Sequence, residues 1–221
     1  MVLPADRRAP AFYTHERDAG PGRALASLTS QILFNTDRSD DAPFLAYGYL
    51  SRVHGLPAPS GKDEDESSAV LTFVVEGRVV DVDRSDTTFM IRSEAALRVF
   101  FAQHSKRSFS QPDSFRRGQE VATYNLKRYV FFSSTNDQLQ DRSFVSLVAS
   151  KPFSFKGVAI NLQYLWGTQL IIEAQARGRE TLPSPLPEYS AAIPYTGSLF
   201  IGGERTEWKA LDVGALLAAP S

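Results

Sequence analysis

The fold is decided by residues 69–83, AVLTFVVEGRVVDVD, which a polar turn at residues 84–86 separates from residues 87–93, TTFMIRS. Along much of both segments every second side chain is apolar, which is the period of a β-strand. Both segments are also rich in β-branched residues, which are common in strands. Gly77 interrupts the first segment, and a glycine inside a strand commonly marks a β-bulge or a bend. The two segments therefore predict an antiparallel β-hairpin that turns at residues 84–86.

Further strands are predicted on both sides of this hairpin. Apolar runs bounded by turn residues indicate strands at residues 44–53, 120–132, 144–149, 158–166, 169–176 and 191–201. Residues 24–34 fit a helix or an irregular strand, and residues 95–101 fit a strand or a helical turn. The pattern amounts to about eight to ten strands with at most one or two short helices, one of them over residues 208–219. We therefore expect an all-β fold, a single antiparallel β-barrel or a strongly bent sandwich, rather than alternating βα units.

The chain is expected to form a single β-barrel domain over residues 23–221, preceded by an N-terminal arm over residues 1–22. The arm is rich in Pro, Arg and Gly and shows no hydrophobic period. No repeat of fixed period is visible in the rest of the chain, which argues against propellers and solenoids.

Residues 57–68 form a Pro-, Gly- and acid-rich stretch, which we interpret as a solvated connection, the alternative being an acidic metal or partner loop. The stretch offers too little apolar area to offset the entropy of ordering it. Replacing it with a short Gly/Ser linker should therefore shift the melting temperature by a few degrees at most in thermal denaturation. A larger drop, equivalent to roughly 1 kcal/mol or more, would contradict this prediction.

Composition excludes several classes of function. The chain contains no Cys, which rules out disulfides, thiolate chemistry and Cys-ligated zinc or iron–sulfur sites. Its 24 basic residues balance 25 acidic ones, so the basic excess typical of nucleic-acid binders is missing and we expect no nucleic-acid partner. The N-terminal sequence has no secretory h-region, and no apolar run approaches ~18 residues, so we expect a cytoplasmic protein with no membrane partner.

The sequence also lacks the common catalytic and cofactor-binding motifs. There is no Gly-x-Ser-x-Gly elbow, no Walker A loop and no His-Glu-x-x-His. The three histidines, His15, His54 and His104, are too far apart for local ligand spacing, and the acidic residues beside the hairpin turn are explained by turn chemistry. We therefore expect no metal and no cofactor, and no residue is identified as catalytic.

Arg128 is a charged residue that the strand pattern places on an apolar face. Alternation puts it on the same side of its strand as Tyr124, Leu126, Val130 and Phe132. A charge that faces a core is costly unless it is paired, so this position predicts a partner carboxylate, a water-filled lumen or an anionic ligand. The alternative is a guanidinium that reaches solvent along its apolar stem. If the face is interior, we expect Arg128 to anchor the polar end of an anionic or carbonyl-bearing ligand.

Tyrosine and tryptophan residues fall within several of the predicted strands. In a barrel wide enough to hold a small ligand, these side chains provide apolar walls that carry a polar group. We therefore expect the ligand-binding residues to be Arg128, Tyr124, Tyr164, Trp166 and Tyr49. The alternative is that the aromatic residues fill an ordinary β core, because strands are generally enriched in them.

Together these patterns favour the binding of a small, largely apolar organic molecule inside the barrel. A cofactor-independent cyclase or isomerase is a close variant, with Tyr124 or Glu173 as the first acid/base candidates. The alternatives are a structural or interaction module with a filled core and, less favoured, an oligonucleotide-binding barrel. The identity of the ligand, the occurrence of a reaction and the oligomeric state are left open by the sequence.

Overall fold

The predicted hairpin is present in the computed structural model, which describes residues 24–35, 40–56 and 65–202. Strand β3 (Leu71–Arg84) pairs antiparallel with β4 (Thr88–Phe101), and the Ser85 N–H donates to the Thr88 carbonyl oxygen at 2.8 Å. The bulge lies between Val79 and Asp81 rather than at Gly77. Gly77 instead allows close packing, because a Cβ atom there would lie 2.5 Å from the Cβ of Ala95. The hairpin prediction is thus confirmed, and the position of the bulge was wrong.

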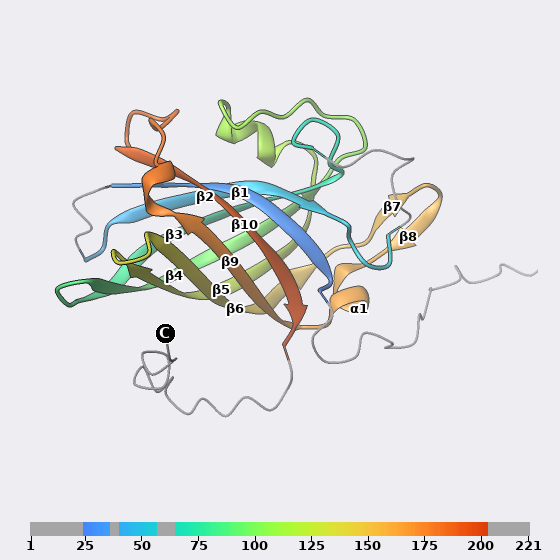
Figure 1. Ribbon diagram of the computed structural model, residues 1–221. Coiled ribbons are helices and arrows are strands. Elements are labelled where there is room, and N and C mark those ends of the chain that lie inside the picture. Colours follow the sequence, from blue (N-terminus) through green and yellow to red (C-terminus); the bar gives the residue numbers. More distant parts are fainter. Residues whose placement is uncertain (1–23, 36–39, 57–64, 203–221) are drawn as a thin grey trace, which may run out of the picture.

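Eight of the described strands close into a barrel (Figure 1). The other six are β1 (Ala26–Phe34), β2 (Pro43–Ser51), β5 (Gln119–Ser133), β6 (Gln138–Ser150), β9 (Gln169–Arg177) and β10 (Ala191–Ile201). Their order around the barrel is β1-β10-β9-β6-β5-β4-β3-β2, and each neighbouring pair is antiparallel. This arrangement confirms the predicted all-β antiparallel barrel and excludes the bent sandwich.

The predicted strand over residues 158–166 is wrong in its second half. Strand β8 (Val158–Ile160) pairs only with β7 (Phe153–Phe155) among the described strands, and the short helix α1 (Leu162–Trp166) follows it. The side chain of Asn161 caps this helix by accepting a hydrogen bond from the Gln163 N–H at 2.9 Å. Gly167 ends the helix with a φ of 83°, which a glycine adopts without strain. Local capping therefore overrides the apolar alternation.

The two ambiguous segments are both strands, because residues 26–34 form β1 and residues 95–101 belong to β4. Besides α1, the described residues contain two 3-10 helices, η1 (Pro112–Arg116) and η2 (Gly178–Glu180). The predicted arm over residues 1–22, the predicted helix over residues 208–219 and most of the loop over residues 57–68 lie outside the described residues. No helix in the described ranges is long and apolar enough to span a membrane.

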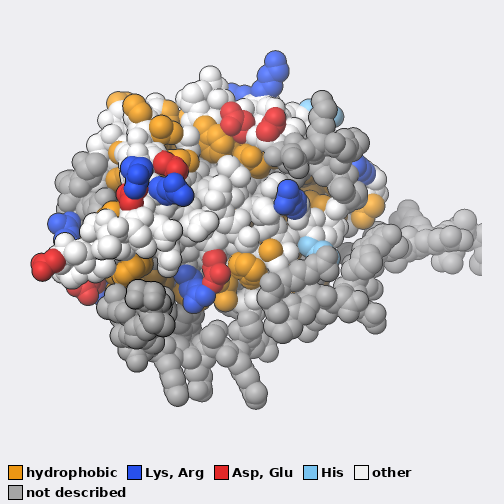
Figure 2. Space-filling model, in the orientation of Figure 1, with side chains coloured by type: hydrophobic (Ala, Val, Ile, Leu, Met, Phe, Trp, Pro, Cys, Tyr) orange, Lys and Arg blue, Asp and Glu red, His pale blue; other side chains and the backbone are white. Residues whose placement is uncertain are grey.

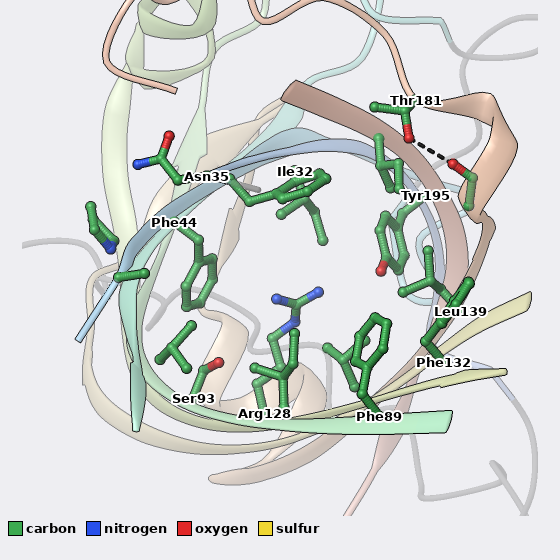
Figure 3. Close-up of a pocket in the computed structure, with 18 of the residues that line it drawn as sticks. Ile32, Asn35, Phe44, Phe89, Ser93, Arg128, Phe132, Leu139, Thr181 and Tyr195 are labelled. Atoms are coloured by element: carbon green, nitrogen blue, oxygen red, sulfur yellow. Dashed lines mark hydrogen bonds between the residues drawn. The ribbon is translucent and has the colours of Figure 1, made fainter. Parts of the chain in front are cut away.

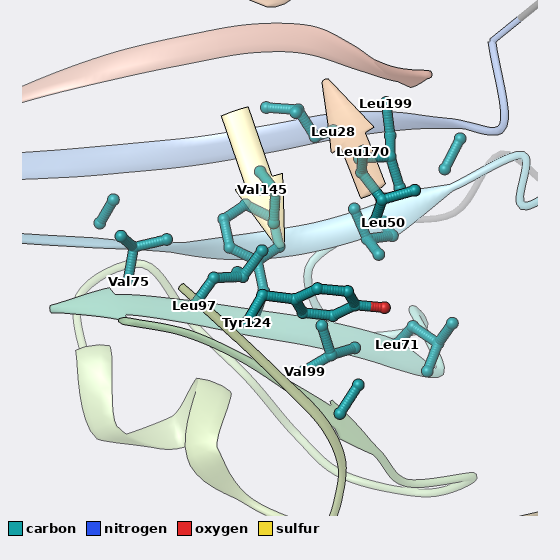
Figure 4. Packing of buried hydrophobic residues seen from close by; sticks show 14 of the residues in the cluster. Leu28, Leu50, Leu71, Val75, Leu97, Val99, Tyr124, Val145, Leu170 and Leu199 are labelled. Carbon is teal, nitrogen blue, oxygen red and sulfur yellow. The ribbon is translucent and has the colours of Figure 1, made fainter. Parts of the chain in front are cut away.

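One half of the barrel interior is filled with apolar side chains (Figure 4). This half lies toward α1, at the end of the barrel where β2 leads to β3, β4 to β5 and β6 to β9. Its inward-pointing residues include Leu28, Leu50, Leu71, Val99, Tyr124, Val145, Leu170 and Leu199. Leu162 and Trp166 of α1 belong to the same apolar cluster and help to close this end.

A second apolar cluster lies outside the barrel wall. The helix η1 covers the outer face of β2 and β3, where Phe115 packs against Tyr47 with ring centroids 5.3 Å apart. The Tyr47 hydroxyl donates to the carbonyl oxygen of Phe109 at 2.9 Å, and Thr72 donates to the carbonyl oxygen of Phe115 at 2.8 Å. The strands β2 and β3 are therefore apolar on both faces, one facing the lumen and the other facing η1.

Candidate functional site

The half of the barrel away from α1 contains a pocket of about 390 Å³ (Figure 3). It lies at the end where β1 leads to β2, β5 to β6 and β9 to β10. Most of its wall is apolar and includes Phe44, Val79, Ile91, Val130, Leu139 and Ile193. The volume falls within the ~300–1,000 Å³ range of ligand pockets in proteins, so the barrel is filled at one end and hollow at the other.

Arg128 forms the polar floor of the pocket together with an aspartate. Its Nε donates to Oδ2 of Asp141 at 2.5 Å, and the Ser143 hydroxyl donates to Oδ1 of the same carboxylate at 3.0 Å. The side chains of Arg128 and Asp141 are only 10% and 7% exposed. Burial alone would lower the pKa of Arg128, but the charge of Asp141 and hydrogen bonds with Asp141 and Tyr195 outweigh burial and raise it. The floor therefore holds a buried ion pair between Arg128 and Asp141.

The guanidinium of Arg128 projects toward the centre of the pocket (Figure 3). Its Cζ lies 5.1 Å from the ring centroid of Phe44 and 5.8 Å from that of Tyr195, and these two rings flank it from opposite walls. Both distances are within the range of cation–π contacts. Since Nε makes the bond to Asp141, the two terminal nitrogens are the ones turned toward the cavity.

Ser93 adds a hydroxyl group to the same floor. It lies on β4 directly opposite Arg128 on β5 in the strand register, and it lines the pocket while only 3% exposed. Its Oγ has no hydrogen-bond partner among the residues that the structure describes. Buried hydroxyls are normally hydrogen-bonded, so Ser93 is a polar group whose partner remains to be supplied.

The mouth of the pocket carries a second ion pair. The Nε of Arg179 lies 2.7 Å from Oδ2 of Asp137, and this hydrogen bond is the main cause that lowers the pKa of Asp137. Thr181, which also lines the mouth, donates to the carbonyl oxygen of Gly178 at 2.6 Å. On the face of the molecule in Figure 2, basic and acidic side chains likewise lie close to one another, in keeping with the net charge of −1.

Of the predicted ligand-binding residues, Arg128 lines the pocket, as the strand alternation indicated. Tyr124 lies within the filled half, where burial raises the pKa of its hydroxyl. Trp166, 2% exposed, packs in the closed end, and Tyr164 is 76% exposed on α1. Tyr49 points out of the barrel, with its ring centroid 6.3 Å from that of Phe109. The structure therefore does not bring these four residues to the pocket.

The acid/base candidate Glu173 also lies away from the pocket. It pairs with Arg142 across β6 and β9 on the outer surface of the barrel. Residues that sequence reasoning missed are Asp141, Ser93 and Tyr195, which converge with Arg128 on the floor. The sequence contained a signal for Asp141, because strand alternation places it on the same face of β6 as Leu139, Ser143 and Val145.

Comparison of the chain with protein-family models, with curated proteins and with solved structures finds no match. Within residues 24–35, 40–56 and 65–202, no group of three or more His, Asp or Glu side chains is placed to hold a metal ion.

Proposed function

We propose that the barrel binds one small, largely apolar organic molecule in its lumen, with the polar end of the molecule accepting hydrogen bonds from Arg128. The observation that carries this proposal is the buried guanidinium whose terminal nitrogens face an apolar-walled cavity of about 390 Å³. Asp141 holds the guanidinium through Nε, so the donor is fixed in position before a ligand arrives. Preorganisation of this kind reduces the ordering cost of binding.

The pocket sets the size and character of the ligand. Since one water molecule occupies ~30 Å³ in the liquid, the cavity suits a molecule with on the order of a dozen or more non-hydrogen atoms. The apolar walls favour a hydrocarbon body, which is driven into the pocket by the removal of apolar surface from water.

The hollow half of the barrel supports ligand binding over the alternative of an interaction module with a filled core. The cyclase or isomerase variant has less support, because Tyr124 and Glu173 both lie away from the pocket. The proposal is therefore limited to binding.

Val79→Trp should block the pocket and abolish binding. Val79 lines the cavity near its mouth, so an indole ring at this position occupies the space intended for the ligand. The neutral naphthyl ketone prodan, whose emission shifts to the blue in apolar surroundings, serves as the probe. We expect wild type to shift the emission of prodan and Val79→Trp to weaken its binding by tenfold or more.

The matched control is Val80→Trp, because Val80 is the next residue on β3 and is exposed on the outside of the barrel. This variant should bind prodan as wild type does, and both variants should keep the wild-type circular-dichroism spectrum. Equal binding by all three proteins would place the probe outside the lumen and contradict the proposal. The absence of binding by wild type would also contradict it.

A further inference from the structure

The hydroxyl of Ser93 identifies a specific position for a ligand atom. It is buried, lines the pocket and has no hydrogen-bond partner within the described part of the chain. A buried polar group without a partner is costly, because the hydrogen bond that it makes with water in the unfolded chain is lost. A ligand that offers an acceptor at this point restores that bond.

The position of Ser93 relative to Arg128 indicates which kind of acceptor group the ligand carries. The two residues are directly opposite in the β4–β5 register, and side chains at such positions have Cβ atoms about 4.5–5.5 Å apart. The guanidinium only donates hydrogen bonds, and the serine hydroxyl has one proton to donate. A single carbonyl oxygen has two lone pairs and can accept from both residues at once.

The charges around the pocket decide between a neutral and an ionised ligand. Arg128 is paired with Asp141 at the floor, and Arg179 is paired with Asp137 at the mouth. The charged side chains that line or support the described pocket are therefore balanced in pairs. A carboxylate bound at the floor would add a buried negative charge without a counterion of its own, whereas a ketone, aldehyde or ester adds none.

We propose that the pocket selects neutral carbonyl compounds over carboxylates of the same skeleton, with Ser93 and Arg128 together holding the carbonyl oxygen. This inference rests on the proposed function, since it specifies the ligand of the same lumen. Ser93 is then a specificity-determining residue, and the apolar walls hold the hydrocarbon part of the ligand.

The test measures displacement of prodan at neutral pH by three matched competitors. These are a straight-chain methyl ketone, the fatty acid and the saturated hydrocarbon, each with the same number of non-hydrogen atoms. The fatty acid is fully ionised under these conditions. We expect the ketone to bind at least tenfold more tightly than the fatty acid, because the ketone brings no charge to the floor.

Ser93→Ala should weaken the binding of the ketone by about tenfold, the effect of losing one hydrogen bond. It should leave the affinity for the hydrocarbon unchanged. Ser93→Thr retains the hydroxyl and should retain the preference for the ketone. The control is Ser30→Ala, because Ser30 is also a buried serine in the barrel wall but is not among the residues that line the pocket. It should leave all three affinities unchanged.

Two kinds of failure are distinguishable. If the competitors bind but the fatty acid binds as tightly as the ketone or more tightly, the inference is wrong and lumen binding stands. The same holds if Ser93→Ala leaves the affinity for the ketone unchanged. If none of the three competitors displaces the probe from wild type, the proposed function itself is wrong.

Discussion

Replacing Arg128 with Met should lower the free energy of unfolding by about 3–5 kcal/mol, because the substitution leaves Asp141 buried without its counterion. Methionine keeps the apolar stem of the arginine, so little packing is lost and the effect reports on the charge. Urea denaturation followed by circular dichroism measures the change. The surface control is Arg92→Met, whose ion pair with Asp81 is half-exposed, and it should cost less than ~1 kcal/mol.

The double variant Arg128→Met with Asp141→Asn tests whether the two residues are coupled. It removes both charges while leaving an amide oxygen that can accept the hydrogen bond from Ser143. We expect the double variant to recover most of the stability that the single variant loses. A double variant as unstable as Arg128→Met would show that the ion pair is not the source of the loss.

The same double variant separates stability from binding. It should fold but lack the guanidinium donor, so its affinity for a carbonyl ligand should fall by ~2 kcal/mol or more, the scale of a hydrogen bond to a charged group. Retention of wild-type affinity by a stably folded double variant would mean that Arg128 supports the barrel but does not contact the ligand.

Trp166→Ala should destabilise the protein by about 3–5 kcal/mol without changing ligand affinity. The indole is the largest fully buried side chain of the described residues, and its removal leaves a cavity in the closed end of the barrel. The pocket lies in the opposite half, so the folded variant should bind prodan as wild type does. Denaturant titration and prodan binding, carried out in parallel, measure the two effects.

The control for this prediction lies on the same helix. Tyr164→Ala removes an aromatic side chain that is 76% exposed, so stability should change by no more than ~0.5 kcal/mol. If Trp166→Ala instead lost binding while keeping its stability, Trp166 would be a ligand-binding residue, as the sequence first suggested.

The antiparallel β-strands and the inward orientation of Arg128 were predictable because both depend on alternation along single strands. Residues 120–132 and 191–201 show this alternation clearly, and they became β5 and β10 with bounds within one residue of those predicted. Closure into a barrel rather than a sandwich depends on the pairing of β1 with β10, which no local pattern encodes.

The errors at the site have separate physical causes. Tyr49 was assigned to the lumen because its strand is apolar on both faces, and only the packing of η1 outside the wall reveals which face is the interior. Tyr164 and Trp166 were assigned to a strand because a five-residue helix is too short for its period to be distinguished from alternation. Asp141 was missed because the predicted strand began three residues after it, so the alternation of β6 was not extended to Asp141 and its partnership with Arg128 was not inferred.

The pairing of β1 with β10, which closes the barrel, affects how the chain folds during synthesis. Strand β1 has β2 on one side and β10 on the other, and β10 is the last strand of the barrel to leave the ribosome. Until then, β1 and β9 each present an unpaired row of backbone N–H and C=O groups, which other chains can pair with. Contacts between such distant parts of a chain form slowly, and partly folded chains with open edges tend to aggregate. The finished barrel has no open edge, so its exposure to aggregation is greatest just before β10 arrives.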